Sequence, residues 1–272
     1  FSILKFNNKF MFIMTYWLGF FFFIIAGLFF GLFGSGGSII IIPVLVYIYD
    51  MPVQEATTYS LFLVFLIASL GTIVHVKKGN SPFKKNLYFI IPAIIFTVFS
   101  RLYLLPSIPD EIIIFNYIIS KQNLLMTIFS VVLFFSAVSM FKKRVFTTNY
   151  DFSFILFLIG AFVGTLTGLL GVGGGFIIIP SLMIFSGINL KEAAFSSLFI
   201  ISINTLTAMF IDFSVFDVAL DLSFLFPLLT FASFGVFIGF YLLNKINLDS
   251  VRKMFSIILL LLSLYIFLIE FF

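Results

Sequence analysis

Two glycine-rich clusters are the part of this 272-residue sequence whose residue types and spacing suggest chemistry most directly. They consist of Gly34, Ser35, Gly36, Gly37 and Ser38 in the first half, and of Gly171, Val172, Gly173, Gly174 and Gly175 in the second. Glycine lets a ligand approach the backbone closely, and consecutive N–H groups can then point into one concavity. A helix that begins after such a cluster has unbonded N–H groups in its first turn, and its dipole favours an anion. The clusters therefore predict a binding site for a small anion, to which Ser35 and Ser38 add hydroxyl donors.

Each cluster also has two alternative interpretations. Glycines let helices pack closely, so the clusters could serve packing alone, as we expect for the Gly27–Gly31 and Gly160–Gly164–Gly168 spacings upstream of them. The helices that end at the clusters present carbonyl oxygens, which could coordinate a coupling cation. Both alternatives remain open on the sequence alone.

Three further polar residues are candidates for substrate contact. Ser60 and Ser197 lie one to two turns into the helices that follow the clusters, where each could line a cavity or bond back to a carbonyl. Asn204 lies inside an apolar run, and polar residues within a membrane helix usually face the interior of the bundle. Hydrogen bonding between helices is the main alternative for Asn204.

The remaining ionisable candidates favour structural roles. Glu55 and Glu192 occupy matching places at predicted helix starts, where an acid suits the helix dipole. His75 is expected at a helix end near the membrane interface. We expect Arg101, near the far end of its helix, to extend to the lipid headgroups, with attraction of an anion as the alternative. The matching position in the second half is Ile238, so the repeat offers Arg101 no charged partner.

The composition excludes most enzyme chemistry. The sequence has no Cys and one His, so thiolate nucleophiles and Cys- or His-rich metal sites are excluded. A hydrolase that pairs Ser35 with His75 is disfavoured, because the two residues are predicted at different depths in the membrane. We therefore expect no enzyme activity, no catalytic residues, no metal and no cofactor.

Hydrophobic runs identify the elements that must position these residues. The sequence is 62% apolar and only 10% charged, and about 20 apolar residues suffice for a helix to cross a bilayer. We predict an all-α polytopic membrane protein that forms a single transmembrane domain over residues 1–272. Apolar runs at about 12–33 and 152–170 precede the clusters, and segments at 38–49 and 176–186, too short to span, follow them. Full-length helices are predicted at 54–76, 87–105, 122–141, 190–211, 222–244 and 251–270.

The chain contains an internal duplication. A shift of 137 residues aligns Gly27–Phe62 with Gly164–Phe199 without a gap, and 16 of the 36 positions are identical. The identities include four glycine pairs, a proline, a glutamate and a serine, which apolar composition alone does not explain. Repeat 1 is predicted at 12–141 and repeat 2 at 152–270.

The distribution of Lys and Arg favours inverted repeats. If each glycine break is the tip of a hairpin, eleven basic residues fall on one side and four on the other, whereas simple kinks divide them nine to six. Since cytoplasmic loops gather Lys and Arg, each repeat is predicted as a glycine-broken helical hairpin followed by three transmembrane helices, with both termini outside. Whether the hairpins dip halfway or span stays open.

The repeated motif resembles the TauE/SafE family of membrane anion exporters. The shared pattern is a glycine-rich stretch, then a proline, then Glu-Ala-x-x-x-Ser-Leu-Phe. It occurs here as Gly31, Gly34, Gly36, Gly37, Pro43, Glu55, Ala56, Ser60, Leu61 and Phe62, and again as Gly168, Gly171, Gly173, Gly174, Pro180, Glu192, Ala193, Ser197, Leu198 and Phe199. The resemblance covers both repeats and implies export of sulfite or organosulfonates across the bacterial cytoplasmic (inner) membrane.

The sequence therefore predicts a secondary transporter that moves a small oxyanion by alternating access. A passive anion channel, or a transporter for a cation or another small solute, is the alternative. The predicted partners are a small anionic substrate and the lipid bilayer, and no nucleic acid. H⁺ or Na⁺ as a coupling ion and a homodimer both remain open.

Overall fold

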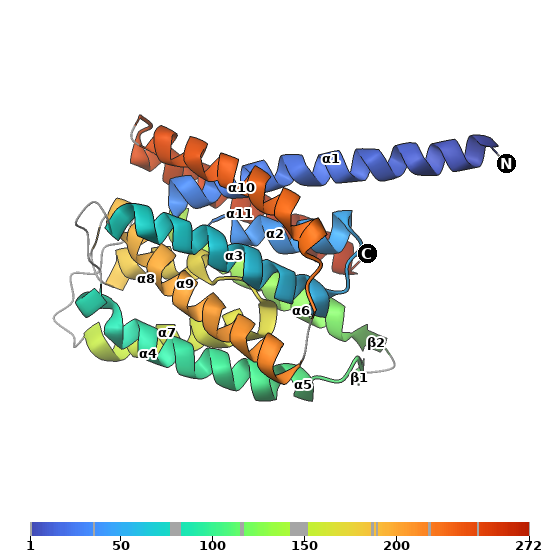
Figure 1. Ribbon diagram of the computed structural model, residues 1–272. Coiled ribbons are helices and arrows are strands. Elements are labelled where there is room, and N and C mark those ends of the chain that lie inside the picture. The colour runs from blue at the N-terminus through green and yellow to red at the C-terminus, as the bar shows by residue number, and fades with distance from the viewer. Residues whose placement is uncertain are drawn as a thin grey trace.

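A computed structural model gives the fold of the chain as a bundle of helices (Figure 1). The structure describes the backbone of residues 2–34, 36–76, 83–114, 117–141, 152–185, 188, 190–216, 219–243 and 245–271. The α-helices are α1 (Ser2–Phe33), α2 (Ser38–Pro43), α3 (Val53–Val76), α4 (Phe83–Phe99), α5 (Leu105–Ser107), α6 (Lys121–Phe141), α7 (Phe152–Leu170), α8 (Gly175–Phe185), α9 (Leu190–Val215), α10 (Leu222–Leu243) and α11 (Leu248–Phe271).

Helices long and apolar enough to cross a membrane dominate the described part of the chain. Seven candidate spans occur there, namely Thr15–Phe33, Val53–Val74, Leu87–Ser107, Lys121–Phe141, Leu190–Val215, Leu222–Leu243 and Asp249–Glu270. Phe154–Leu170, Ser38–Ile48 and Gly175–Phe185 are shorter apolar helices. The predicted helical, polytopic membrane fold is confirmed.

Three local features differ from the sequence prediction. A two-stranded antiparallel hairpin, β1 (Glu111–Ile114) with β2 (Tyr117–Ser120), lies between two predicted helices, because its isoleucines favour strand and the runs are too short for helix. The π-helical segments η1 (Val44–Ile48) and η2 (Ser100–Leu104) extend α2 and α4, and η1 directly follows Pro43, which cannot donate an N–H bond.

The spanning helices of one repeat pack mainly on helices of the other repeat. Helix α1 packs along α10 and α7 along α4, while α3 packs on α9 and α6 on α11. The upstream glycines make these contacts close, as predicted. A Cβ atom added to Gly27 would lie 1.8 Å from the Ala232 carbonyl oxygen, and one added to Gly164 would lie 2.2 Å from the Ala93 carbonyl oxygen.

The repeat-related helices α3 and α9 run in opposite directions. Thr58, near the start of α3, bonds to Asp212 near the end of α9. Gly71, near the end of α3, lies against Leu198 in the first half of α9. Inverted repeats require such an antiparallel pair, although the orientation of each repeat in a membrane stays a prediction.

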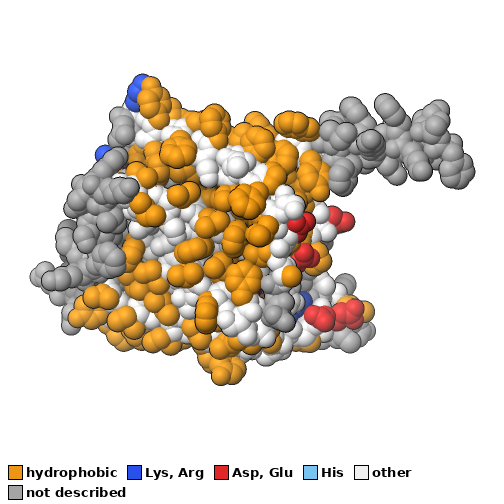
Figure 2. All heavy atoms as spheres, in the orientation of Figure 1, with side chains coloured by type: hydrophobic (Ala, Val, Ile, Leu, Met, Phe, Trp, Pro, Cys, Tyr) orange, Lys and Arg blue, Asp and Glu red, His pale blue; other side chains and the backbone are white. Residues whose placement is uncertain are grey.

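The surface in Figure 2 is apolar over its middle and acidic at one end. Exposed hydrophobic side chains such as Phe210, Phe226 and Phe237 belong to the spanning helices. Exposed carboxylates, including Glu55 and Glu111, lie where α3 and β1 begin. The apolar middle, with charged residues at its ends (Figure 2), is the surface expected of a protein surrounded by lipid.

Candidate functional site

Both predicted helix breaks are present and buried. Helix α1 ends at Phe33 and α2 begins at Ser38, while α7 ends at Leu170 and α8 begins at Gly175. The described residues of both clusters, namely Gly34, Gly36, Gly37, Ser38 and 171–175, are all buried, and Ser35 lies outside the described residues. The chain turns through the left-handed region at Gly34 (φ +71°) and Gly171 (φ +65°), which side chains rarely allow.

Each break packs against a helix of the other repeat. A Cβ atom on Gly34 would lie 2.1 Å from the Ala194 carbonyl oxygen in α9, and one on Gly171 would lie 2.5 Å from the Thr57 Cβ in α3. Gly34 and Gly171 are 137 residues apart, and so are Thr57 and Ala194. The two breaks therefore make reciprocal contacts with the α3–α9 pair.

The short helices begin directly at the breaks. The Ile40 and Ile41 N–H groups donate to the Gly37 carbonyl, and the Ile177 and Ile178 N–H groups donate to the Gly174 carbonyl. The positive end of each helix dipole consequently lies at its break. This arrangement suits a negative charge beside either cluster.

The repeat-related serines have different partners. The Ser197 hydroxyl donates to the Ala194 carbonyl at 2.8 Å, and it lies 3.4 Å from the Gly34 carbonyl of the first break. The Ser60 hydroxyl is fully buried and has no hydrogen-bond partner. Ser197 thus bonds back to a carbonyl, which was one of its two predicted roles, whereas Ser60 keeps its capacity to bind.

Three buried polar atoms without partners lie on surfaces that pack against the second break. Ser60 occupies the same face of α3 as Thr57 and Val64, which contact Gly171 and Gly173. The Thr167 Oγ1 has no partner and lies 3.1 Å from the Cβ position of Gly174. The Asn204 Nδ2 also has no partner.

Asn204 lies one turn beyond Ile201 in α9, and the Ile201 Cγ2 is 2.6 Å from the Cβ position of Gly173. The interhelical hydrogen bond that was the alternative role for Asn204 therefore does not involve its Nδ2 atom. Buried donors without a partner are costly in an apolar interior, so such a group in a native protein usually marks water or a ligand.

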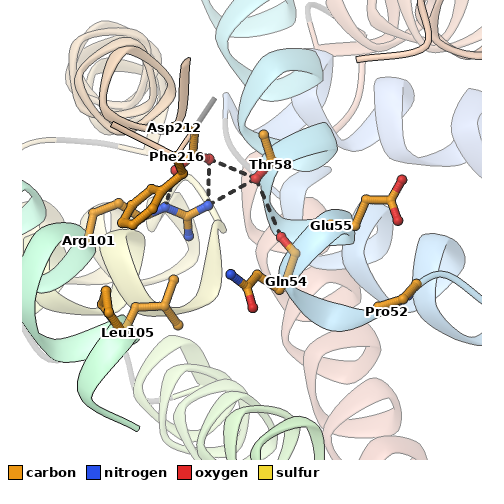
Figure 3. Close-up of a pocket in the computed structure, with 9 residues that line it drawn as sticks. Pro52, Gln54, Glu55, Thr58, Arg101, Leu105, Asp212 and Phe216 are labelled. Atoms are coloured by element: carbon orange, nitrogen blue, oxygen red, sulfur yellow. Dashed lines mark hydrogen bonds and ion pairs between the residues drawn. The ribbon is translucent and has the colours of Figure 1, made fainter. Parts of the chain in front are cut away.

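A buried ion pair lies at one end of the α3–α9 pair, and the sequence did not predict it (Figure 3). Arg101 is only 1% exposed, and its Nε and Nη2 atoms donate to Asp212 Oδ1 and Oδ2 at 2.5 Å each. The expectation that Arg101 extends to the headgroups is wrong. Its partner does not occupy the repeat-matching position, and Asp212, which directly follows the predicted helix end at 211, instead belongs to the last part of α9.

Arg101 also connects this ion pair to the second break. Its Nη1 donates to the Gly168 carbonyl at 3.1 Å, and its Nη2 donates to Thr58 Oγ1 at 3.1 Å. Gly168 supplies one of the last four carbonyls of α7, which lack partners within the helix. The guanidinium therefore caps α7 where the break begins, and its charge suits the negative end of that helix.

A pocket of about 310 Å³ opens beside the ion pair (Figure 3). Its lining consists of Pro52, Gln54, Glu55, Thr58, Arg101, Leu105, Pro106, Asp212 and Phe216. None of the site residues predicted from the sequence is in this described lining. The signals that could have revealed it were an arginine inside an apolar run and a carboxylate directly after another run, since such charges usually pair.

The other candidate residues remain peripheral. Glu55 and Glu192 lie in the first turns of α3 and α9, as predicted, and both are exposed. The side chain of His75 lies outside the described residues. Within the described part of the chain, no group of three His, Cys, Asp or Glu residues could hold a metal ion.

Comparison with known proteins gives a family match over most of the chain. Residues 19–266 match the family described as sulfite exporter TauE/SafE. A probable membrane transporter protein of Methanocaldococcus jannaschii is 31% identical over 166 residues, 58% of each chain. A probable membrane transporter protein of Haemophilus influenzae is 30% identical over 187 residues, which cover 64% of this chain and 65% of the relative. These alignments thus span less than two thirds of either relative, and no solved structure matches.

Proposed function

The chain belongs to the sulfite exporter TauE/SafE family, and from that premise we propose that this membrane transporter moves a small oxyanion by alternating access. The proposed substrate is sulfite or an organosulfonate, and the proposed direction is export across the bacterial cytoplasmic membrane. The proposed binding region is the pair of helix breaks together with Ser60, Ser197 and Asn204.

One observation carries the proposal, namely the unpartnered polar atoms around the second break. Non-helical backbone survives in a membrane only where protein or a water-filled cavity surrounds it. The Ser60 and Thr167 hydroxyls and the Asn204 amide add side-chain donors to the positive end of α8. An oxyanion offers several acceptor oxygens to such donors, whereas a cation offers none.

The unequal contacts of the two breaks support alternating access. Ser197 contacts the first break, while its repeat mate Ser60 has no partner at the second. In a transporter built from inverted repeats, each repeat adopts in turn the conformation of the other. We expect the opposite state to give Ser60 the contact that Ser197 now has.

Flux into liposomes that contain the purified protein tests the proposal, with radiolabelled isethionate as the sulfonate. Thr167→Val and Ser60→Ala remove unpartnered hydroxyls with little change in volume, so each should lower flux several-fold, as expected for a lost bond of about 1 kcal/mol. Thr207→Val is the matched control, because the Thr207 hydroxyl already donates to the Ile203 carbonyl within its own helix. Unchanged flux in both test variants would remove the second break from the mechanism.

The alternatives predict different kinetics. A passive channel gives flux that does not saturate with isethionate concentration, whereas a transporter saturates. A cation transporter gives flux of a labelled cation that isethionate does not stimulate. Either result would contradict the proposed function.

A further inference from the structure

Two neighbouring N–H donors of the Arg101 guanidinium bind the Asp212 carboxylate, and an oxyanion could accept the same two hydrogen bonds. The Asp212 carboxylate takes the Nε and Nη2 donors side by side, while Nη1 is held by the Gly168 carbonyl. Two parallel N–H donors bind two oxygens of a carboxylate, phosphate or sulfonate with the same geometry. The Asp212 carboxylate therefore occupies the place that the acid group of a solute would take.

This place can be reached from the pocket. Arg101, Asp212 and Thr58 all line it, and its volume of about 310 Å³ lies at the lower end of the range of ligand sites. Figure 3 shows the ion pair at one side of the pocket and Glu55 at another. A small anion that enters the pocket consequently meets the guanidinium together with its present partner.

The charges around the pocket determine when an anion can bind. Arg101 is its one cation among the described lining residues, and Asp212 and the exposed Glu55 are its carboxylates. Among the elements packed on α9 here, α7 contributes the neutral Gly168 carbonyl and α3 contributes Thr57, Thr58 and Glu55. A monoanion added to this set would leave an excess of negative charge at low dielectric, which is unfavourable unless one carboxylate is neutralised.

We propose that Arg101 receives the acid group of the transported solute in this pocket, and that Asp212 yields its place by taking up a proton. This proposal rests on the proposed function, because the solute is the transported oxyanion. A proton from solution bonds to a carboxylate oxygen of Asp212, and the two N–H bonds from Arg101 pass to two oxygens of the solute. One proton and one monoanion are bound together, so the charge of the buried site is unchanged.

The contact with Gly168 gives this exchange a consequence at the second break. Arg101 caps the last turn of α7, directly before Gly171. A guanidinium that follows the solute would alter this cap and, with it, the end of the helix at the break. The pocket therefore acts as a binding site at which proton uptake is coupled to the solute.

Proton uptake measured during anion binding tests the proposal. Isethionate is the probe, because a sulfonate stays ionised throughout the range used and any pH dependence then belongs to the protein. In weakly buffered solution, saturating isethionate should cause the wild-type protein to take up about one proton per anion bound. Affinity should rise up to about tenfold for each unit by which the pH falls, because one proton is taken up with each anion. Equal affinity at about pH 5.5 and about pH 7.5, without proton uptake, would overturn the proposal.

Two variants assign the proton. In Asp212→Asn, isethionate should bind without proton uptake and with an affinity that does not depend on pH. Glu55→Gln removes the other carboxylate of the pocket and should keep the proton uptake. If Glu55→Gln abolishes the uptake and Asp212→Asn keeps it, the proposal is wrong.

Asp212→Asn leaves the buried Arg101 charge without a counter-charge, and this variant could fail to fold. A double variant in which both residues are neutral avoids that problem. The double variant Arg101→Gln/Asp212→Asn should purify as a single species, bind isethionate at least tenfold more weakly than the wild type, and take up no proton. Proton uptake that persists in the double variant would overturn the proposal. If the wild type shows saturable flux without proton uptake, this inference fails and the proposed function stands, whereas the absence of saturable anion binding or flux contradicts both.

Discussion

Replacement of Gly34 by alanine should disrupt the first helix break. Gly34 has φ +71°, and a Cβ atom there would lie 2.1 Å from the Ala194 carbonyl oxygen and 2.9 Å from the Ala194 Cα. The left-handed conformation costs a side chain about 1–2 kcal/mol. Overpacking against a backbone that cannot move away costs a further ~1–3 kcal/mol. The Gly34→Ala variant should therefore lose about 2–5 kcal/mol of stability in total.

Gly36→Ala in the same cluster is the matched control. Gly36 does not have a positive φ, and its Cβ would meet the ring of Phe255 at 2.5 Å, which is a side chain rather than backbone. The Gly36→Ala variant should lose only the stability that overpacking costs, about 1–3 kcal/mol. Thermal and denaturant unfolding of the two variants in detergent, compared with flux in liposomes, measures the difference. If Gly34→Ala is as stable as Gly36→Ala, the first break is not held in the left-handed turn against α9, and the reciprocal packing of the breaks is wrong.

Three further predictions concern the buried polar groups. Asn204→Leu should unfold at the same or a higher temperature than the wild type while its flux falls, because the unpartnered amide costs roughly 1–3 kcal/mol in the folded state. Arg101→Met should lose about 3–5 kcal/mol of unfolding free energy, and addition of Asp212→Leu should recover most of it, because the single change leaves a buried charge unpaired. A double variant no more stable than Arg101→Met would contradict this. Ser197→Ala should lose about 1 kcal/mol with its hydrogen bond, whereas Ser60→Ala should lose none, as unfolding of the two variants side by side would show.

The sequence predicted the helix breaks because clusters of glycine within apolar runs are typical of non-helical backbone. The glycine pairs recur at the same spacing in two repeats, and the short helices begin at Ser38 and Gly175 as expected. The direction of the helix dipoles follows from those positions alone. The ligand that the breaks bind is not tested by the fold and remains a proposal.

The ion pair could not be predicted in the same way, because its partners are 111 residues apart and break the symmetry of the repeats. Position 238, the repeat mate of Arg101, holds isoleucine, so comparison of the repeats gives Arg101 no partner. An incorrect helix boundary prevented the prediction of Asp212 as the partner of Arg101. Asp212 follows a predicted helix end at 211, but α9 continues to Val215 and turns the carboxylate into the bundle.

The pairing of α3 with α9 is also a tertiary feature. Both helices are apolar on most sides, so their periodicity does not show which face meets which neighbour. Only the packed structure places Ser60 toward the second break and separates its surroundings from those of Ser197.

Accessibility of Ser60 to an anionic thiol reagent tests most directly whether the breaks line a path for a negative solute. The sequence contains no cysteine, so Ser60→Cys introduces a single thiol. A sulfonate-bearing methanethiosulfonate should modify this thiol in functional protein, and isethionate should slow the modification. Glu111→Cys, at an exposed position in β1 outside the candidate spans, is the control that should react and should not be protected by isethionate. A Ser60→Cys thiol that never reacts, or that reacts at the same rate with and without isethionate, would show that the second break does not bind the transported anion.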